Sequence, residues 1–207
     1  MKVLLINGSP HAGGCTFTAL SEIAEALHGD GVDTDFFHIG AKPVNGCMAC
    51  GSCAKTGKCI LDDKVNELAD KALDYDGFIF GTPVYYAGIS GGLKSFMDRL
   101  FYSAGEKFRL KPAAAVASAR RAGTTATLDA INKYFALAQM PVVSSQYWNM
   151  VHGRTPEEVK QDLEGLQIMR TLGHNMAWLL KSIEAGKQAG LVPPTPEETH
   201  IFTNFIR

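Results

Sequence analysis

The sequence predicts an α/β protein in which a five-stranded parallel sheet lies between two layers of helices. Short apolar runs alternate along the chain with segments whose apolar residues recur every three or four positions, as in helices that pack on a sheet. The apolar runs have no polar side, which is typical of parallel strands covered by helices on both faces. A chain of 207 residues is long enough for one such domain.

Five apolar runs predict the strands. They lie at residues 3–6, 32–39, 77–81, 113–117 and 142–150. Helical spacing of apolar residues predicts the helices between and after them. These positions fall within residues 20–27, 65–73, 93–101, 128–137 and 159–183. Because the carboxyl ends of parallel strands share one edge of a sheet, we expect the loops after the first, third and fourth strands to meet there.

Capping residues predict several helix ends. Gly29 and Gly31 end the first helix, since glycine readily adopts the left-handed conformation common at helix ends. Asp62 or Asp63 caps the second helix. Thr155 followed by Pro156 is a strong start signal, and the last helix is expected to continue from it for roughly thirty residues.

The charge balance and the lengths of the apolar runs exclude several classes of protein. Lysine and arginine number 20 against 21 acidic residues, so a net charge of −1 favours neither nucleic acid nor an anionic membrane as a partner. No apolar run approaches the roughly 20 residues of a membrane span, and the first is too short for a signal peptide. We expect a cytoplasmic protein, in which clustered cysteines indicate metal or redox chemistry before disulfides.

The loop at residues 7–18, NGSPHAGGCTFT, predicts a phosphate site. Backbone N–H groups of a glycine-rich turn and of the first helical turn point toward one spot, where the helix dipole favours an anion. Ser9, Thr16 and Thr18 add hydroxyl donors. The loop lacks the G-x-G-x-x-G and G-K-[ST] patterns, so a single phosphate monoester fits better than a pyrophosphate. The alternative is an ordinary turn whose glycines serve geometry alone.

Two further loops predict a binding site for a flat ring. Tyr85 and Tyr86 lie between glycines in the loop at residues 82–92 and supply a planar apolar wall, although packing in the core is the alternative for either one. The loop at residues 118–125 offers hydroxyl and backbone groups for the polar edge of a ring. Arg120 and Arg121 lie in this loop, where a solvated surface charge is the alternative role.

These residues together resemble the NADPH-dependent FMN reductase family of flavodoxin-like proteins over roughly the first 150 residues. The motifs that carry the resemblance are GSP at 8–10, GCT at 14–16, TPVY at 82–85 and GGLKSFMDR at 91–99. It implies a flavodoxin-like three-layer α/β/α sandwich that holds FMN by three loops. The predicted cofactor-binding residues are Ser9, His11, Cys15, Thr16, Phe17, Thr18, Pro83, Val84, Tyr85, Tyr86, Gly88, Ser118, Arg120, Gly123 and Thr124.

Two of these residues have an alternative role. A loop histidine such as His11 is often merely solvated. Cys15 belongs to the phosphate turn but suits a small packing role as well, and its position at a helix start tends to lower the pKa of a thiol.

A compact cysteine group predicts a metal centre. Cys47, Cys50, Cys53 and Cys59 form the spacing C-x2-C-x2-C-x5-C, which is near that of bacterial ferredoxins. The spacing resembles the cysteine motif of iron–sulfur flavoproteins, a branch of the same family, and implies a [4Fe–4S] cluster. Four thiolates also suit zinc, and a loop that binds no metal stays a third alternative.

The predicted function is FMN-dependent oxidoreduction. NADPH or NADH would deliver a hydride to FMN. The electrons would pass to a small-molecule acceptor, which is a quinone, an azo or nitro compound or free flavin, or to the iron–sulfur cluster. We name no catalytic residue, because hydride transfer to a flavin requires no acid or base from the protein. The alternatives are an iron–sulfur flavoprotein that carries electrons between redox partners, and a nucleotide-binding module without flavin.

The predicted organisation is an FMN-binding domain at residues 1–186, with a cysteine-rich loop at 43–61, and a tail at residues 187–207. We expect a homodimer or homotetramer whose contacts involve the last helix and this tail, because a terminal segment so apolar should not stay exposed. The apolar tail residues are Ile201, Phe202, Phe205 and Ile206. A tail folded back on its own core is the alternative. The family resemblance also implies dimers with flavin sites near the subunit boundary.

Overall fold

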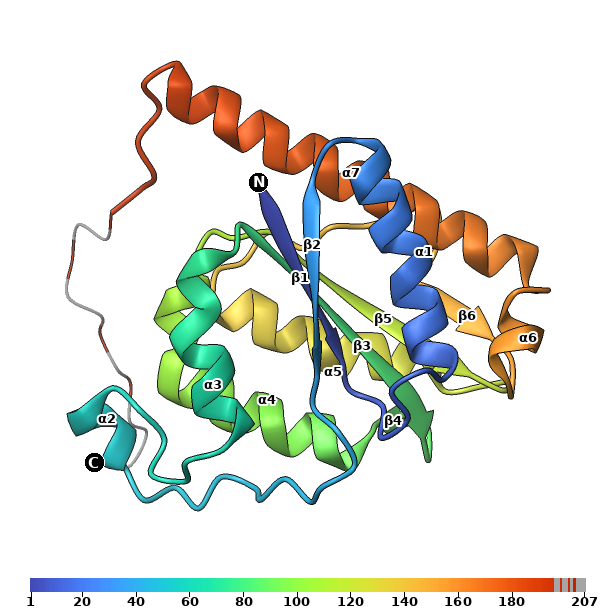
Figure 1. Cartoon of the computed structure of the whole chain (residues 1–207). Helices are drawn as coiled ribbons and strands as arrows, with labels where there is room; N and C mark the ends of the chain where they lie inside the picture. The colour runs from blue at the N-terminus through green and yellow to red at the C-terminus, as the bar shows by residue number, and fades with distance from the viewer. Residues whose placement is uncertain (196–197, 199–200, 202, 204–207) are drawn as a thin grey trace.

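The computed structural model describes residues 1–195, 198, 201 and 203. A twisted sheet lies between two helix layers, which confirms the predicted three-layer architecture (Figure 1). The strands are β1 (Lys2–Asn7), β2 (Asp33–His38), β3 (Gly77–Tyr85), β4 (Gly88–Ile89), β5 (Ala113–Ala119) and β6 (Met150–His152). Strands β2, β1, β3, β5 and β6 follow one another across the sheet and are parallel, so the strand order reverses between β1 and β3. Ligands of open α/β sheets bind beside this reversal, at the carboxyl edge.

The helices divide between the two faces of the sheet. They are α1 (Cys15–Gly29), α2 (Ser52–Thr56), α3 (Lys64–Lys71), α4 (Gly91–Ala104), α5 (Thr124–Leu137), α6 (Pro156–Val159) and α7 (Leu163–Gln188), with 3-10 turns η1 (Ala72–Asp74) and η2 (Gly105–Phe108). Helices α1 and α7 cover one face, and α3, α4 and α5 cover the other (Figure 1). No helix among the described residues is long and apolar enough to cross a membrane.

Strand β1 shows why an apolar run is typical of a strand buried on both sides. Val3 and Leu5 pack with the core beneath α1 and α7, whereas Leu4 and Ile6 pack with the core beneath α3, α4 and α5. Successive side chains of a strand point to opposite faces, so a run without polar residues satisfies both cores. Burying each such side chain stabilises the fold by about 1.5–3 kcal/mol.

The sheet has six strands rather than the predicted five. β3 continues to Tyr85 because Thr82 and Pro83 still pair with β5, so residues 82–85 belong to a strand and not to a loop. The chain then turns at residues 86–87 and returns as β4, which pairs antiparallel with the end of β3. β4 has only two residues, and both pair with β3. So short a strand has no apolar run from which the sequence could predict it.

The last strand and the last helix also differ from the prediction. Residues 142–150 form a single bridge at Val142 and a turn in which Ser145 bonds to the backbone of Tyr147, and β6 begins only at Met150. Thr155 caps a helix as predicted, but that helix, α6, ends at Val159. Asp162 accepts a bond from the N–H of Gly165 and thereby starts α7 as a second helix.

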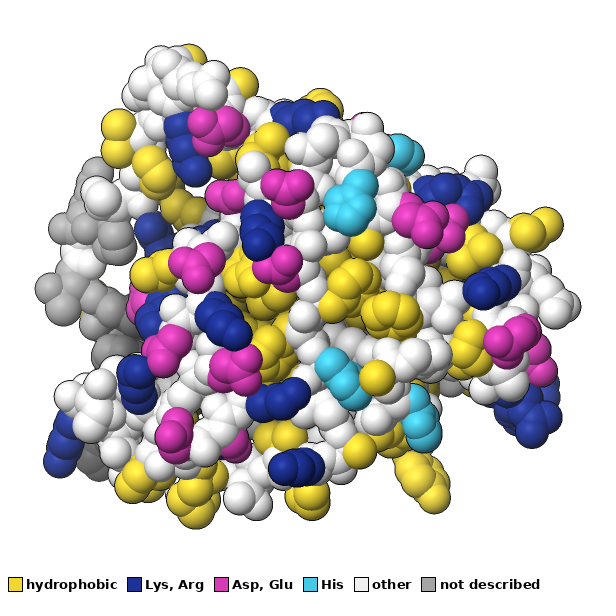
Figure 2. All heavy atoms as spheres, viewed as in Figure 1, with side chains coloured by type: hydrophobic (Ala, Val, Ile, Leu, Met, Phe, Trp, Pro, Cys, Tyr) yellow, Lys and Arg dark blue, Asp and Glu magenta, His cyan; other side chains and the backbone are white. Residues whose placement is uncertain are grey.

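The face in Figure 2 carries lysine and arginine side chains interspersed with acidic ones over α3. Lys58 pairs with Asp70, and Lys71 pairs with Glu67. Such mixed charges do not form a continuous basic surface on this face, in agreement with the net charge of −1.

Helices α1 and α7 approach closely at Gly173, which predicts a large effect of adding one methyl group. A Cβ there would lie 2.7 Å from the Cβ of Ala26 and 3.0 Å from the carbonyl oxygen of Ile23. We expect Gly173→Ala to destabilise the protein by about 1–3 kcal/mol, since backbone contacts cannot yield without moving a helix. Gly186→Ala, in the same helix, is the control. Its Cβ would meet only the Leu191 side chain, at 3.2 Å. The higher helix propensity of alanine should therefore stabilise this variant by up to about 1 kcal/mol. Urea unfolding measures both, and equal midpoints for the two variants would contradict the close approach.

Candidate functional site

A pocket of about 700 Å³ opens at the carboxyl edge of the sheet, beside the reversal of strand order. Four segments line it: residues 9–16, 83–85, 118–120 and 153–156. The first follows β1, and the second and third lie at the carboxyl ends of β3 and β5, so the three predicted segments meet at this edge. The fourth follows β6 and was not predicted, although its place after the last strand of a parallel sheet is a signal that it belongs to the same edge.

Asn7, at the end of β1, holds the first loop in place by hydrogen bonds from its side chain to the loop backbone. Its side chain is almost fully buried; Oδ1 accepts the N–H of Ser9 at 3.0 Å and Nδ2 donates to the carbonyl of Ala12 at 3.1 Å. The hydroxyl of Ser9 in turn accepts the N–H of His11 at 3.1 Å. The loop therefore holds its shape through its own side chains, a role for Asn7 that the sequence analysis missed.

The N-terminus of α1 is arranged for an anion. Gly14 occupies the N-cap position, and within the described chain no side chain caps this 15-residue helix. The N–H groups of the first helical turn have no partner within the helix, and the helix dipole places partial positive charge there. A phosphate at this end of the pocket would accept their hydrogen bonds.

Buried hydroxyl groups tie the loops to one another. Ser90 donates to the carbonyl of Gly8 at 3.0 Å, and the Thr82 hydroxyl donates to Ser90 at 3.3 Å. The Thr16 and Ser118 hydroxyls are 2.8 Å apart and join the first loop to the end of β5. The Thr16 hydroxyl, predicted as a phosphate donor, thus already has a buried partner, and its backbone N–H belongs to the uncapped first turn.

The β3–β4 hairpin carries backbone strain beside the pocket. Its turn residues Tyr86 and Ala87 have φ of 49° and 58°, values that non-glycine residues seldom adopt. Gly123, at φ 90°, lies against this turn: a Cβ there would be 2.5 Å from the Cα of Ala87. The contact with α5 holds the strained turn in place, and strain of this kind clusters at functional sites.

The pocket brings together part of the predicted set and leaves part outside. The predicted residues that line it are Ser9, His11, Cys15, Thr16, Pro83, Val84, Tyr85, Ser118 and Arg120. The predicted residues outside its lining are Phe17, Thr18, Tyr86, Gly88, Gly123 and Thr124. Of these, Phe17 packs on Phe36, Thr18 donates to the carbonyl of Gly14, and Thr124 is buried with its hydroxyl toward the sulfur of Met150. Arg154 lines the pocket as a second cation besides Arg120.

The pKa of the Cys15 thiol is raised, against the tendency expected for a helix start. Burial is the main cause; a backbone hydrogen bond opposes it, and the carboxylates of Glu158 and Glu157 add to it. Cys15 is half-buried, and its thiol points to the carbonyl of Gly153 at 3.7 Å. Desolvation of the thiolate outweighs the helix dipole at this position.

This shift predicts slow alkylation of Cys15. A thiol with a raised pKa holds less thiolate at any pH below that pKa, and thiolate is the reactive form. The alkylation rate of Cys15 by iodoacetamide should therefore reach half of its plateau above the ordinary pKa of 9.0. Peptide mass spectrometry over a pH series measures it, with the same cysteine in urea as control. Coincident curves for folded and unfolded chains would contradict the burial.

A second, smaller pocket gathers the four clustered cysteines. Cys47, Cys50, Cys53 and Cys59 all line it, together with the buried Arg99 of α4. None of these cysteines is in a disulfide. Within the described residues, no group of three or more Cys, His, Asp or Glu side chains has converged into a ready metal site. Four thiols around one pocket are nevertheless the donor set of an iron–sulfur cluster or of zinc.

The cysteine loop is less irregular than expected. It contains the short helix α2, which begins after Gly51 and ends before Gly57, two glycines in the left-handed conformation. Cys53 lies in this helix, so the loop turns sharply on both sides of it. Cys47 and Cys50, before this helix, and Cys59, after it, line the same pocket.

A three-layer sandwich with an uncapped helix N-terminus and a pocket of about 700 Å³ at its carboxyl edge is typical of flavin-dependent oxidoreductases. The chain belongs to the NADPH-dependent FMN reductase family, whose model matches residues 1–155. The family resemblance of the loop motifs is thereby confirmed.

Individual proteins are similar over most of the chain. An iron–sulfur flavoprotein of Methanocaldococcus jannaschii is 34% identical over 192 residues, which cover 89% of this chain and 100% of that protein. Among solved structures, RosB with bound 8-demethyl-8-formylriboflavin-5'-phosphate superposes with a TM-score of 0.68 at 14% identity, over 100% of this chain and 94% of that one. An archaeal flavodoxin gives a TM-score of 0.60 at 16% identity, over 87% and 99% of the two chains. The two structures support the fold.

Proposed function

We propose that this protein is an FMN-dependent NAD(P)H oxidoreductase that also holds an iron–sulfur cluster in its cysteine loop. The observation that carries the proposal is the pocket at the carboxyl edge, where an uncapped helix and loops tied by buried hydroxyls surround a space of about 700 Å³. Ligand pockets for molecules of this size span roughly 300–1,000 Å³. The family of the chain and the name of its archaeal relative support a flavin and a cluster, respectively.

The residues divide the binding of FMN between two ends of the pocket. The first turn of α1 and the hydroxyl of Ser9 hold the phosphate, and Asn7 keeps the loop in the shape that presents them. Pro83, Val84 and Tyr85 form one wall for the ring, and Ser118 to Arg120 form the other. When bound, FMN accepts a hydride from a nicotinamide and passes electrons onward.

The protein's own groups leave one side of the ring site accessible to a second molecule. Tyr85 is 47% exposed although it lines the pocket, so it offers an aromatic surface at the entrance. Arg120 and Arg154 are exposed on the pocket's rim and provide positive charge for the phosphates of NADPH or NADH. We propose a small-molecule electron acceptor of quinone-like or flavin type at the same face.

The direct test is anaerobic purification followed by visible spectroscopy and cofactor analysis. We expect one FMN per chain, flavin bands, and a broad additional absorption from about four iron and four sulfide atoms. NADPH or NADH should then be oxidised in the presence of a quinone. A flavin that only dithionite reduces would favour an electron carrier instead, and a colourless chain that takes up no added FMN would overturn the proposal.

We further propose a cytoplasmic homodimer or homotetramer that uses α7 and the tail. Trp178 on α7 is 70% exposed, and Leu191 and Val192 after it are 71% and 82% exposed, so both α7 and the start of the tail carry exposed apolar side chains. Phe202, Phe205 and Ile206 lie outside the described residues, and Ile201 is exposed. Covering such a surface is a usual reason for association.

Truncation tests the tail's part in this assembly. Light scattering should show an oligomer for the full chain and a smaller species for a chain ending at Gly190, because the tail's apolar residues are removed. Full-length protein with Trp178→Ser serves as a separate probe of α7. A monomeric full-length protein would defeat the proposed assembly, and an unchanged oligomer after truncation would remove the tail from it.

A further inference from the structure

Cys59 is held far more firmly than the other cysteines of its loop. Its N–H donates to Oδ1 of Asn66 at 3.1 Å, and its carbonyl accepts from Nδ2 of Asn66 at 2.9 Å. Its sulfur accepts the Nε–H of Arg99 at 3.2 Å. Among the described residues, no hydrogen bond reaches the sulfur of Cys47, Cys50 or Cys53, and Cys47 and Cys50 are exposed. One sulfur of the four is therefore fixed before any metal binds.

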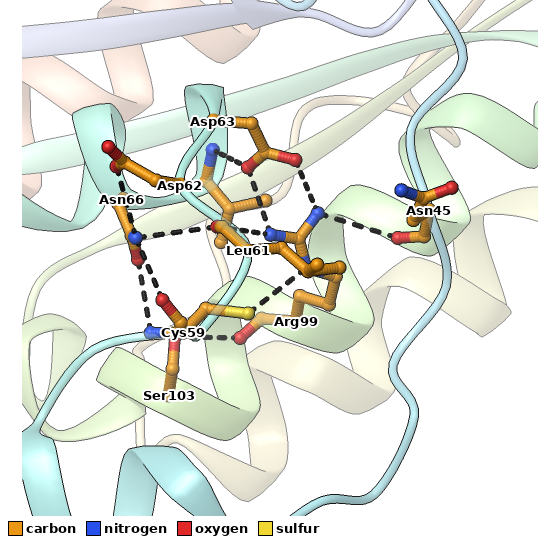
Figure 3. A network of polar contacts seen from close by, with 9 residues as sticks. Asn45, Cys59, Leu61, Asp62, Asp63, Asn66, Arg99 and Ser103 are labelled. Atoms are coloured by element: carbon orange, nitrogen blue, oxygen red, sulfur yellow. Dashed lines mark hydrogen bonds and ion pairs between the residues drawn. The ribbon is translucent and has the colours of Figure 1, made fainter.

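Arg99 is itself immobilised by its remaining donors, as Figure 3 shows. Its Nη1 and Nη2 donate to the two carboxylate oxygens of Asp63 at 2.6 and 2.9 Å. Nη2 also donates to the carbonyl of Leu61 at 2.8 Å, and Nη1 to that of Asn45 at 3.5 Å. The side chain is 1% exposed. Because Nη1 and Nη2 are both held by Asp63, the orientation of the planar guanidinium is fixed, and its Nε–H points at the sulfur of Cys59.

The partner of Arg99 is fixed as well. Asp63 caps α3 by accepting the N–H of Val65 at 3.0 Å, so its carboxylate cannot follow a moving arginine. The bidentate pair of Arg99 and Asp63 would be enough to connect α3 and α4. The additional N–H aimed at a cysteine sulfur is the feature that a purely structural role leaves unexplained.

We propose that Arg99 is the positioning residue of the cysteine site: it orients the Cys59 sulfur for ligation and raises the reduction potential of the bound iron–sulfur cluster. This inference rests on the cluster in the proposed function. A cationic N–H donated to a ligating sulfur stabilises the extra negative charge of the reduced cluster, and hydrogen bonds to sulfur are among the determinants of cluster potential. Burial of the guanidinium limits screening by water and so strengthens the effect.

The first test compares midpoint potentials by EPR-monitored redox titration of anaerobically prepared protein. Arg99→Lys keeps the charge but loses the Nε–H. The double variant Arg99→Met/Asp63→Asn removes both charges, while the asparagine introduced at position 63 still caps α3. We expect lower potentials in both, with the larger shift in the double variant. The control Arg170→Gln removes one positive charge from α7, where Arg170 pairs with Glu22 of α1, and should leave the potential unchanged. Cluster-containing Arg99 variants with the wild-type potential would overturn the inference.

The second test needs no substitution and so does not depend on a variant that folds. Wild-type protein is labelled with ¹⁵N on the arginine side chains, and pulsed EPR of the reduced cluster is recorded. We expect a ¹⁵N coupling from the hydrogen-bonded Nε. A complete cluster without this coupling would overturn the inference alone. Wild-type protein without iron would instead defeat the proposed cluster, and with it this inference.

Discussion

Gly123→Ala is expected to destabilise the protein by about 2–5 kcal/mol. The φ of 90° at Gly123 costs an alanine about 1–2 kcal/mol. The new Cβ would also lie 2.5 Å from the Cα of Ala87 and 2.9 Å from Cγ1 of Val84, and overpacking of this kind costs about 1–3 kcal/mol. The contact is with backbone, so no side-chain rotation relieves it.

The same substitution should weaken FMN binding, because the hairpin that it displaces carries one wall of the pocket. Val84 and Tyr85 line the pocket and lie directly before the strained turn. Losing about 1.4 kcal/mol of contacts raises Kd tenfold. Urea unfolding and fluorescence titration with FMN measure the two effects.

Gly88→Ala is the matched control for Gly123→Ala. Gly88 lies in the hairpin that Gly123 contacts, but its Cβ would meet nothing closer than the carbonyl oxygen of Tyr85, at 3.7 Å. We expect a change in unfolding free energy of no more than about 0.5 kcal/mol, as for ordinary surface positions. If both variants unfold at the wild-type midpoint, Gly123 does not hold the hairpin as described.

Cys59→Ala is expected to remove the iron–sulfur cluster completely while FMN stays bound. A [4Fe–4S] cluster takes four cysteine ligands, and this chain offers one set of four around one pocket. The pocket proposed for FMN is formed by other segments, so its occupancy should not change. Iron and sulfide analysis after anaerobic preparation, beside the FMN content of the same sample, measures both.

Cys15→Ala provides the control for this loss. Cys15 lies at the start of α1 and lines the pocket proposed for FMN, not the pocket of the cysteine loop. Its removal should leave the iron content at the wild-type value. Iron retained by Cys59→Ala, or lost from Cys15→Ala, would reject the assigned ligands. If wild-type protein contained one zinc atom per chain and no iron, the four cysteines would form a tetrahedral zinc site instead of a cluster site.

The sequence predicted those features of the fold that depend on residues close to one another along the chain. The alternation of strands and helices, the turn after β1 and the cap at Thr155 follow from local spacing and capping preference. The meeting of three loops at one edge then follows from parallel topology alone. Two elements were missed for different reasons. β4 exists because it pairs with β3, a partnership that its own residues do not indicate. The last helix divides for a local reason, because Asp162 caps α7 through the N–H of Gly165, and the helical spacing of apolar residues continues across this break.

The amino-acid sequence by itself determined the sandwich, the glycine-rich turn after β1 and the set of four cysteines, because periodicity and motif spacing act within a few residues of each other. Only the tertiary structure decided that Thr16 bonds to Ser118, that residues 153–156 line the pocket at the carboxyl edge, and that Arg99 points at Cys59. Each of these contacts joins side chains separated by tens of residues. Their geometry depends on how whole helices and strands pack, which no local pattern records.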